Sequence, residues 1–232
     1  MEISRYQKKG RKKRLCEDIL LCEKGDDTIF CGIADGQSGK KYCREGAKIA
    51  LDAVKDYMLR DRYSLTDERS NGRYNDEMQS ELLREIRKRI RDHAVETGAD
   101  LADYASTLCC VLCNLVTKTF SCIHLGDGRI AGITKEKKIQ TLSAPENGPI
   151  KNYTYLTTTD GAMSHVHFHF GDLHRFQHLI LLSDGAERLF RTLRLNKILC
   201  DEILLRDEKS FPEYFREKNF TDDASIIILS DL

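Results

Sequence analysis

The sequence has few of the features that divide a chain into domains or carry it into a membrane. It contains three prolines in 232 residues, and no segment has the composition of a linker. The opening residues, MEISRYQKKGRKKRL, include no apolar stretch like that of a signal peptide, and the apolar runs elsewhere are far too short to span a bilayer. We therefore expect residues 1–232 to form a single domain with one sizeable core, in a soluble cytoplasmic protein.

The chain also lacks a net charge and a regular cysteine framework. Lys+Arg and Asp+Glu both total 37, so general attraction to nucleic acid or to a membrane is not expected, and any electrostatic function must be local. The nine cysteines are odd in number and irregularly spaced, which favours reduced thiols. Cys110 and Cys113 form a Cys-x-x-Cys, but a strand would send them to opposite faces, so we expect them to fill the core.

Apolar spacing predicts a β-rich chain with a few covering helices. Residues 18–23 and 28–34 flank a polar turn and predict a hairpin. Apolar residues recur at helical spacing within 39–58 and again within 78–94. From Ser106 onward, short β-rich runs separated by turn residues predict an antiparallel meander. This order of elements predicts an α+β fold in which helices cover the sheets.

Aspartate recurs where apolar runs end. The chain has four Asp-Gly dipeptides, which begin at Asp35, Asp127, Asp160 and Asp184. Asp160 lies in the polar TTTDGAM, as in an ordinary turn, whereas the other three directly follow apolar runs. Asp222 and Asp223 come immediately before the last apolar run. Carboxylates at the ends of several central strands can converge on one point.

Such convergence would have an energetic consequence. Two carboxylates about 4 Å apart repel by roughly 4 kcal/mol at a protein-like effective dielectric, so three or four together would cost on the order of 10 kcal/mol. Hard divalent cations such as Mg²⁺ or Mn²⁺ would neutralise them, and could also polarise a phosphoryl group and activate water. Spacing alone leaves two interpretations open, a metal cluster or a set of independent turns.

Six short motifs follow one another over most of the chain. They are RLCEDILL, FCGIADGQSG, YASTLCCVL, IHLGDGRI, LILLSDGAERLF and TDDASIIIL. Their order and content resemble those of the metal-dependent serine/threonine protein phosphatases (type 2C, PPM), particularly the compact bacterial members. The resemblance implies a layered α-β-β-α sandwich, in which two mainly antiparallel sheets lie face to face with helices outside.

The resemblance also implies a site for two Mn²⁺ or Mg²⁺ ions and, as in many bacterial members, a third and weaker one. Asp35 would bridge two ions, and Asp184 and Asp222 would complete one of the two sites. Glu17 and the carbonyl of Gly36 would serve the other. The family resemblance thus favours the metal cluster over independent turns.

The implied reaction is direct attack of a metal-activated water on phosphoserine or phosphothreonine, without a covalent enzyme intermediate. Asp18 would hold that water, and Asp127 would help to bind the third ion together with Asp184. The expected partner is a phosphoprotein substrate. The phosphatase would remove phosphate groups that a serine/threonine kinase adds to this substrate. We expect the protein to act as a monomer.

Two positions depart from the pattern of the family. A phosphate-binding arginine usually stands four residues before the glutamate, where this chain has Lys13, with Arg14 next to it. A lysine attracts phosphate as a point charge but lacks the bidentate fork, so we expect Lys13 and Arg14 to contact the substrate phosphate more weakly. Gln37 replaces a histidine proposed as general acid in some members, which leaves protonation of the leaving group to water.

These departures keep a second function open, that of a non-catalytic pseudophosphatase acting as a binding or regulatory module. The complete carboxylate set argues against it, because clustered carboxylates without a function would be costly to keep.

Two further patterns have structural interpretations. His165, His167 and His169 alternate in HVHFHF, and on a strand they would share one face, more simply as a polar face than as a zinc site. An amphipathic segment at 194–207 precedes the last strand.

Overall fold

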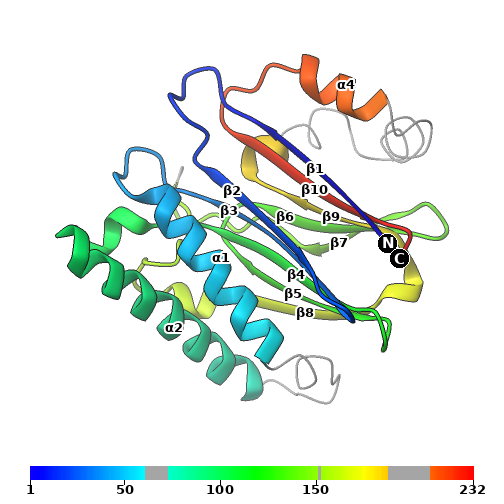
Figure 1. The fold of residues 1–232 in the computed structure, drawn as a ribbon, viewed down its shortest axis with the longest axis horizontal. Coiled ribbons are helices and arrows are strands. Elements are labelled where there is room, and N and C mark those ends of the chain that lie inside the picture. The colour runs from blue at the N-terminus through cyan, green and yellow to red at the C-terminus, as the bar shows by residue number, and fades with distance from the viewer. Residues whose placement is uncertain (61–72, 151–152, 188–209) are drawn as a thin grey trace.

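Two five-stranded antiparallel sheets form the centre of the molecule in a computed structural model, which describes residues 1–60, 73–150, 153–187 and 210–232 (Figure 1). The first sheet consists, in order, of β2 (Asp18–Lys24), β3 (Thr28–Asp35), β4 (Leu108–Asn114), β5 (Thr119–Leu125) and β8 (His167–Asp172). The second consists, in order, of β1 (Glu2–Lys8), β10 (Ala224–Ser230), β9 (Phe176–Leu182), β6 (Arg129–Thr134) and β7 (Ile139–Ser143). The predicted two-sheet α+β sandwich is confirmed.

Helices cover the outer faces of both sheets. The helices α1 (Cys43–Arg60) and α2 (Arg73–Thr97) pack on the first sheet, and α4 (Ser210–Glu217) packs on the second (Figure 1). Short 3-10 helices lie between them: η2 (Leu101–Tyr104), η3 (Ala162–His165) and η4 (Leu173–Arg175). No described helix combines the length and the apolar character that crossing a membrane requires.

Strand β3 shows why the central strands are apolar on both faces. Ile29 and Cys31 lie in the core between the two sheets, whereas Phe30 and Ala34 lie in the core beneath the helices. The same alternation sends Cys110 towards the helices and Cys113 towards the other sheet, as predicted. A strand that is covered on both sides therefore appears as a continuous apolar run.

The two ends of the chain meet in the second sheet. Strand β1 runs antiparallel to β10, with Glu2 opposite Ser230 and Lys8 opposite Ala224, and both termini lie side by side (Figure 1). Strand β1 is not predicted from the sequence. Its alternation of apolar and polar residues is weak, and its hydrogen-bonding partner lies at the other end of the chain.

The antiparallel runs after Ser106 form hairpins, as expected, but they do not form one continuous meander. Strands β4 and β5 belong to the first sheet, whereas β6 and β7 belong to the second. The chain changes sheets at Gly126, whose φ of 109° is a conformation that L side chains rarely adopt. Asp127 follows immediately, in the short connection between β5 of the first sheet and β6 of the second.

The prediction that three histidines share a strand face is wrong for His165. Strand β8 begins at His167, so His165 belongs to η3 and does not share a strand face with His167 and His169. The short helix η3 begins directly after Gly161, which interrupts the extended chain before the strand. The amphipathic segment expected at 194–207 falls outside the described residues.

Gly46 in α1 allows the helix to approach the backbone of η2. A Cβ atom at this position would lie 1.9 Å from the carbonyl oxygen of Tyr104. We expect Gly46→Ala to lower the free energy of unfolding by about 1–3 kcal/mol, the usual cost of overpacking, despite the better helix propensity of alanine. Denaturant unfolding would measure the change. Lys48→Ala, at an exposed position of the same helix, is the control, and equal stability of the two variants would contradict the prediction.

Candidate functional site

Acidic residues from both sheets gather where strands begin or end. Asp18 starts β2 directly opposite Asp35, the last residue of β3. Asp184 follows β9, and Asp222 precedes β10, which is the antiparallel neighbour of β9. Asp127 follows β5 at the point where the chain changes sheets. Antiparallel pairing thus brings residues that are far apart in sequence to the same edge.

A pocket of about 660 Å³ lies among these residues. Four carboxylates line it, those of Asp35, Asp127, Asp184 and Asp222. Gly36 and Gln37 also line it, as do residues of a later loop, which include Asn147, Tyr153 and Thr154. The four predicted aspartate ligands and Gly36 therefore face one shared space. Glu17 and Asp18 do not line it, and Asp18 instead lines a separate cavity together with Arg5 and Arg44.

Burial and mutual repulsion raise the pKa values of two of these carboxyl groups. Burial is the main cause of a rise in the pKa of Asp18 to about 6, with a further contribution from Asp223. The pKa of Asp35 is raised well above its ordinary value by burial and then by the charges of Asp18, Asp184 and Asp127. The folded chain thus holds carboxylates that oppose one another's ionisation.

Asp18 is the most deeply placed member of the group. It is 1% exposed, and neither of its carboxylate oxygens accepts a well-formed hydrogen bond from the described residues. Nearby Ser183 and Ser225 only partly offset the effect of burial on its pKa. A buried carboxylate in this situation needs a proton or a nearby cation.

The donor set fits hard divalent cations in type and charge. Its members offer carboxylate and carbonyl oxygens, which Mg²⁺ and Mn²⁺ prefer. As the side chains are placed, no three carboxylate, imidazole or thiol groups of the described residues lie close enough together to enclose an ion. The carboxylates surround the pocket, and binding a cation would require them to move inward.

Lys13 already supplies one positive charge at the edge of the pocket. Its ammonium forms an ion pair with Glu17, donates to the Ser38 hydroxyl and lies 3.2 Å from Asp222 Oδ1. Burial lowers the pKa of Lys13, but its contacts with Glu17 and Asp222 outweigh this and raise it, so the side chain stays charged. The neighbouring Arg14 is exposed and forms no ion pair with the described residues.

Asp223 is a buried residue whose role is not predicted from the sequence. It is 1% exposed, its Oδ1 accepts from the Gly10 amide at 2.8 Å, and its Oδ2 accepts from the Glu17 amide at 2.6 Å. The side chain thereby ties the loop between β1 and β2 to the start of β10 and holds Glu17 beside the pocket. Its partners are more than 200 residues away, so no local pattern could have indicated them.

The glycines of the Asp-Gly dipeptides serve two different purposes. Gly161 has a φ of 78°, as expected for the turn predicted at Asp160. Gly185 instead lies against the start of the last strand, where a Cβ atom would be 2.0 Å from the carbonyl oxygen of Asp223. The absence of a side chain at Gly185 therefore allows Asp184 and Asp222 to approach each other.

Comparison with solved structures finds the same fold in several bacterial phosphatases. A bacterial serine phosphatase has a TM-score of 0.71 at 15% identity, covering 99% of this chain and 97% of that one. Stp1 from Staphylococcus aureus, a serine/threonine phosphatase, has a TM-score of 0.70 at 15% identity, covering 100% and 95%. RsbX, crystallised in complex with magnesium, has a TM-score of 0.61 at 13% identity, covering 97% and 92%. A search of the curated proteins finds no match to this chain.

The raised pKa of Asp18 predicts how stability without metal depends on pH. Between its ordinary pKa of 3.8 and its folded value of about 6, the folded state holds a proton that the unfolded state has released. Stability should therefore fall as pH rises through this window, by on the order of 2–3 kcal/mol. Asp18→Asn should remove this part of the slope. Unfolding in a chelator from pH 4.5 to 7 would measure it, with Asp26→Asn, at an exposed turn, as control. An unchanged slope in Asp18→Asn would contradict the assignment.

The sequence itself identifies the family. The sequence model described as Protein phosphatase 2C matches residues 7–218, which is most of the chain. The matched region contains the segments from Glu17 to Asp184 that line or support the pocket. Together with the shared fold, this match confirms the resemblance inferred from the six motifs: the chain belongs to the protein phosphatase 2C family.

Proposed function

We propose that this chain hydrolyses phosphoserine and phosphothreonine in proteins, using two Mn²⁺ or Mg²⁺ ions and a third, weaker one. One observation carries the proposal: carboxylates from both sheets of a protein phosphatase 2C fold surround a single pocket, where burial and the charges of Asp18, Asp184 and Asp127 raise the pKa of Asp35. This charge would be neutralised by cations, and a phosphate group could then enter the pocket.

The residues around the pocket divide naturally into ligand groups. Asp35 ends β3 of the first sheet and lines the pocket together with carboxylates of the second sheet, so it is suited to bridge two ions. Asp184 and Asp222, from neighbouring strands, would complete one site. Glu17 and the Gly36 carbonyl would serve the other site. The Gly36 amide donates to the backbone carbonyl of Glu17 at 3.3 Å, which keeps these two residues close together.

Bound divalent cations would supply charge neutralisation, polarisation of the phosphoryl group and a more acidic water. Asp18, buried opposite Asp35 in the first sheet, would accept a hydrogen bond from the attacking water and help to position it. Asp127 would help to bind the third ion. Its Oδ2 already accepts a hydrogen bond from the Thr154 hydroxyl at 2.8 Å, which orients the carboxylate.

Two side chains would handle the substrate. Lys13 lies at the edge of the pocket and would attract the phosphate once cations replace its ammonium beside Glu17 and Asp222. Arg14, which is exposed in the same loop, would add long-range attraction. Gln37 lines the pocket, but its amide cannot act as a general acid. Water would therefore protonate the leaving group.

We propose a cytoplasmic monomer that acts on a phosphoprotein and opposes a serine/threonine kinase. The neutral overall charge of the chain supports recognition of the substrate at the pocket and its surroundings, without general attraction to nucleic acid.

A second function is a non-catalytic pseudophosphatase that acts as a binding module. The observation that favours it is the Lys13 ammonium, which already pairs with Glu17 and lies 3.2 Å from Asp222. An internal cation at this position could stabilise the fold without metal. Activity and metal binding separate the two functions.

Substitution of Lys13 tests both the metal and the phosphate. Lys13→Met should tighten Mn²⁺ binding in calorimetry, because a competing ammonium is removed. It should also raise the KM for a phosphothreonine peptide about tenfold, since a charged contact to phosphate is worth about 1.5–3 kcal/mol. Lys13→Arg should lower the KM by restoring the bidentate fork. Lys12→Met, at an exposed position, is the control, and a Lys13→Met enzyme that resembles it in both measurements would contradict these roles.

Hydrolysis of a phosphothreonine peptide with Mn²⁺ tests the proposed activity directly. Asp184→Asn should reduce kcat by about 100-fold or more, as expected when a main electrostatic stabiliser is lost. Asp160→Asn is a matched control, because Asp160 also precedes glycine but belongs to a turn outside the lining of the pocket. Wild-type turnover no higher than that of Asp184→Asn would exclude the enzyme and favour the binding module. No Mn²⁺ or Mg²⁺ binding in calorimetry would exclude the metal site.

A further inference from the structure

We propose that His165 is a positioning residue that clamps a substrate-contacting flap over the pocket. The flap consists of residues 146–150 and 153–155, which form two short arms. The arms pair through an antiparallel bridge between Asn147 and Thr154, and the Gly148 amide donates to the Tyr153 carbonyl at 2.8 Å. This inference rests on the proposed function for the identity of the substrate, but the clamp itself does not.

The flap forms part of the pocket wall beside the carboxylates. Asn147, Tyr153 and Thr154 line the pocket, and the Thr154 hydroxyl donates to Asp127. The side chain of Ile150 is 69% exposed. A peptide whose phosphorylated residue enters the pocket would therefore have the flap beside it, whereas a small phosphate ester would fit within the pocket.

His165 contacts both arms of the flap. Its Nδ1 lies 2.6 Å from Glu146 Oε1, on the first arm. Its ring stacks on the ring of Tyr155, on the second arm, with centroids 3.4 Å apart and an interplanar angle of 11°. His167 Nε2 bonds to the other oxygen of the same Glu146 carboxylate. One imidazole thus joins Glu146 and Tyr155, the first and last residues of the flap.

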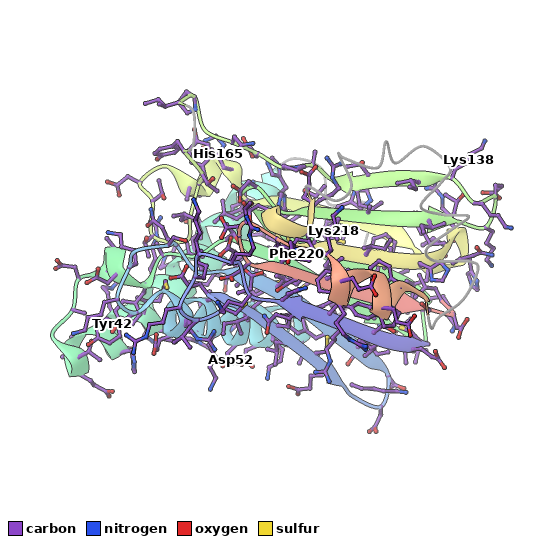
Figure 2. All side chains as sticks on the ribbon, turned by 90° about the horizontal axis from the view of Figure 1, so that it is seen from above. Tyr42, Asp52, Lys138, His165, Lys218 and Phe220 are labelled. Atoms are coloured by element: carbon purple, nitrogen blue, oxygen red, sulfur yellow. The ribbon has the colours of Figure 1, made fainter. Side chains whose placement is uncertain are left out.

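The segment that carries His165 is firmly attached to α2. Arg87 donates to the carbonyls of Thr157 and Thr159 at 2.8 and 2.7 Å, and Gln79 donates to the carbonyl of Val166 at 2.7 Å. Val166, next to His165, is fully buried. Figure 2 shows His165 well away from Lys138, which marks the far end of the β6–β7 hairpin. His165 therefore connects a rigid support to the flap.

The clamp should matter for peptide substrates and not for small ones. Without His165 the flap would lose a hydrogen bond and a ring stack, while Asp35, Asp184 and Asp222, which belong to other segments of the chain, would keep their positions. We expect His165→Ala to raise the KM for a phosphothreonine peptide about tenfold, equivalent to about 1.4 kcal/mol, with little change in kcat. The KM for p-nitrophenyl phosphate should stay the same.

Two conservative variants separate the two contacts. His165→Gln can still donate to Glu146 but loses the stack, whereas His165→Phe keeps the stack and loses the hydrogen bond. Each should restore part of the peptide KM that His165→Ala loses. His174→Ala, at an exposed histidine of η4, is the control and should leave both substrates unaffected.

Hydrogen exchange tests the clamp without relying on activity. In His165→Ala, the amides of Glu146 and Gly148, which donate to the carbonyls of Gly126 and Tyr153, should exchange about tenfold faster than in the wild type, with strands β3 and β9 unchanged. Unchanged exchange in the flap would overturn the clamp. A peptide KM that stays constant, or that rises equally with the KM for p-nitrophenyl phosphate, would overturn the positioning role. A wild type that hydrolyses neither substrate would contradict the proposed function but leave the exchange result valid.

Discussion

Repulsion among carboxylates at one end of two stacked sheets is the constraint on which the rest of this structure depends. Asp18 is almost fully buried opposite Asp35, and the charges of Asp127 and Asp184 add to the rise in the pKa of Asp35. Such an arrangement is costly unless cations or protons offset it. The fold tolerates this cost because the strands on either side are held by extensive apolar packing.

Backbone contacts bring the carboxylates together and keep them there. The absence of a side chain at Gly185 lets the segment after β9 lie against Asp223, directly before β10, and the Asp223 side chain ties the Glu17 loop to the same place. These contacts are buried and specific, so they place the carboxylates around one pocket before any ion binds. Bound cations would then draw the carboxylates inward.

The departures from the family pattern lie on the rim of the pocket and not at its base. Lys13 stands where an arginine is usual, and its ammonium pairs with Glu17. Gln37 stands where some members have a histidine. In the proposed reaction, both changes would affect how phosphate arrives and how the leaving group departs, whereas the carboxylates that would bind metal are all present. The flap forms another part of the pocket wall, and His165 contacts both of its arms through Glu146 and Tyr155.

The sequence by itself indicated an α+β fold and the aspartates at the ends of apolar runs, because both are local features that a linear pattern records. The six motifs added, by resemblance, the two stacked sheets and the grouping of the acidic residues. The sequence also separated the turn at Asp160 from the other three dipeptides. Only the tertiary structure decided that β1 pairs with β10, that the meander divides between two sheets at Gly126, and that Asp223 holds Glu17. These features depend on contacts between distant segments. The energy of such a contact depends on which segments meet in space, and the neighbouring residues in the sequence do not record it.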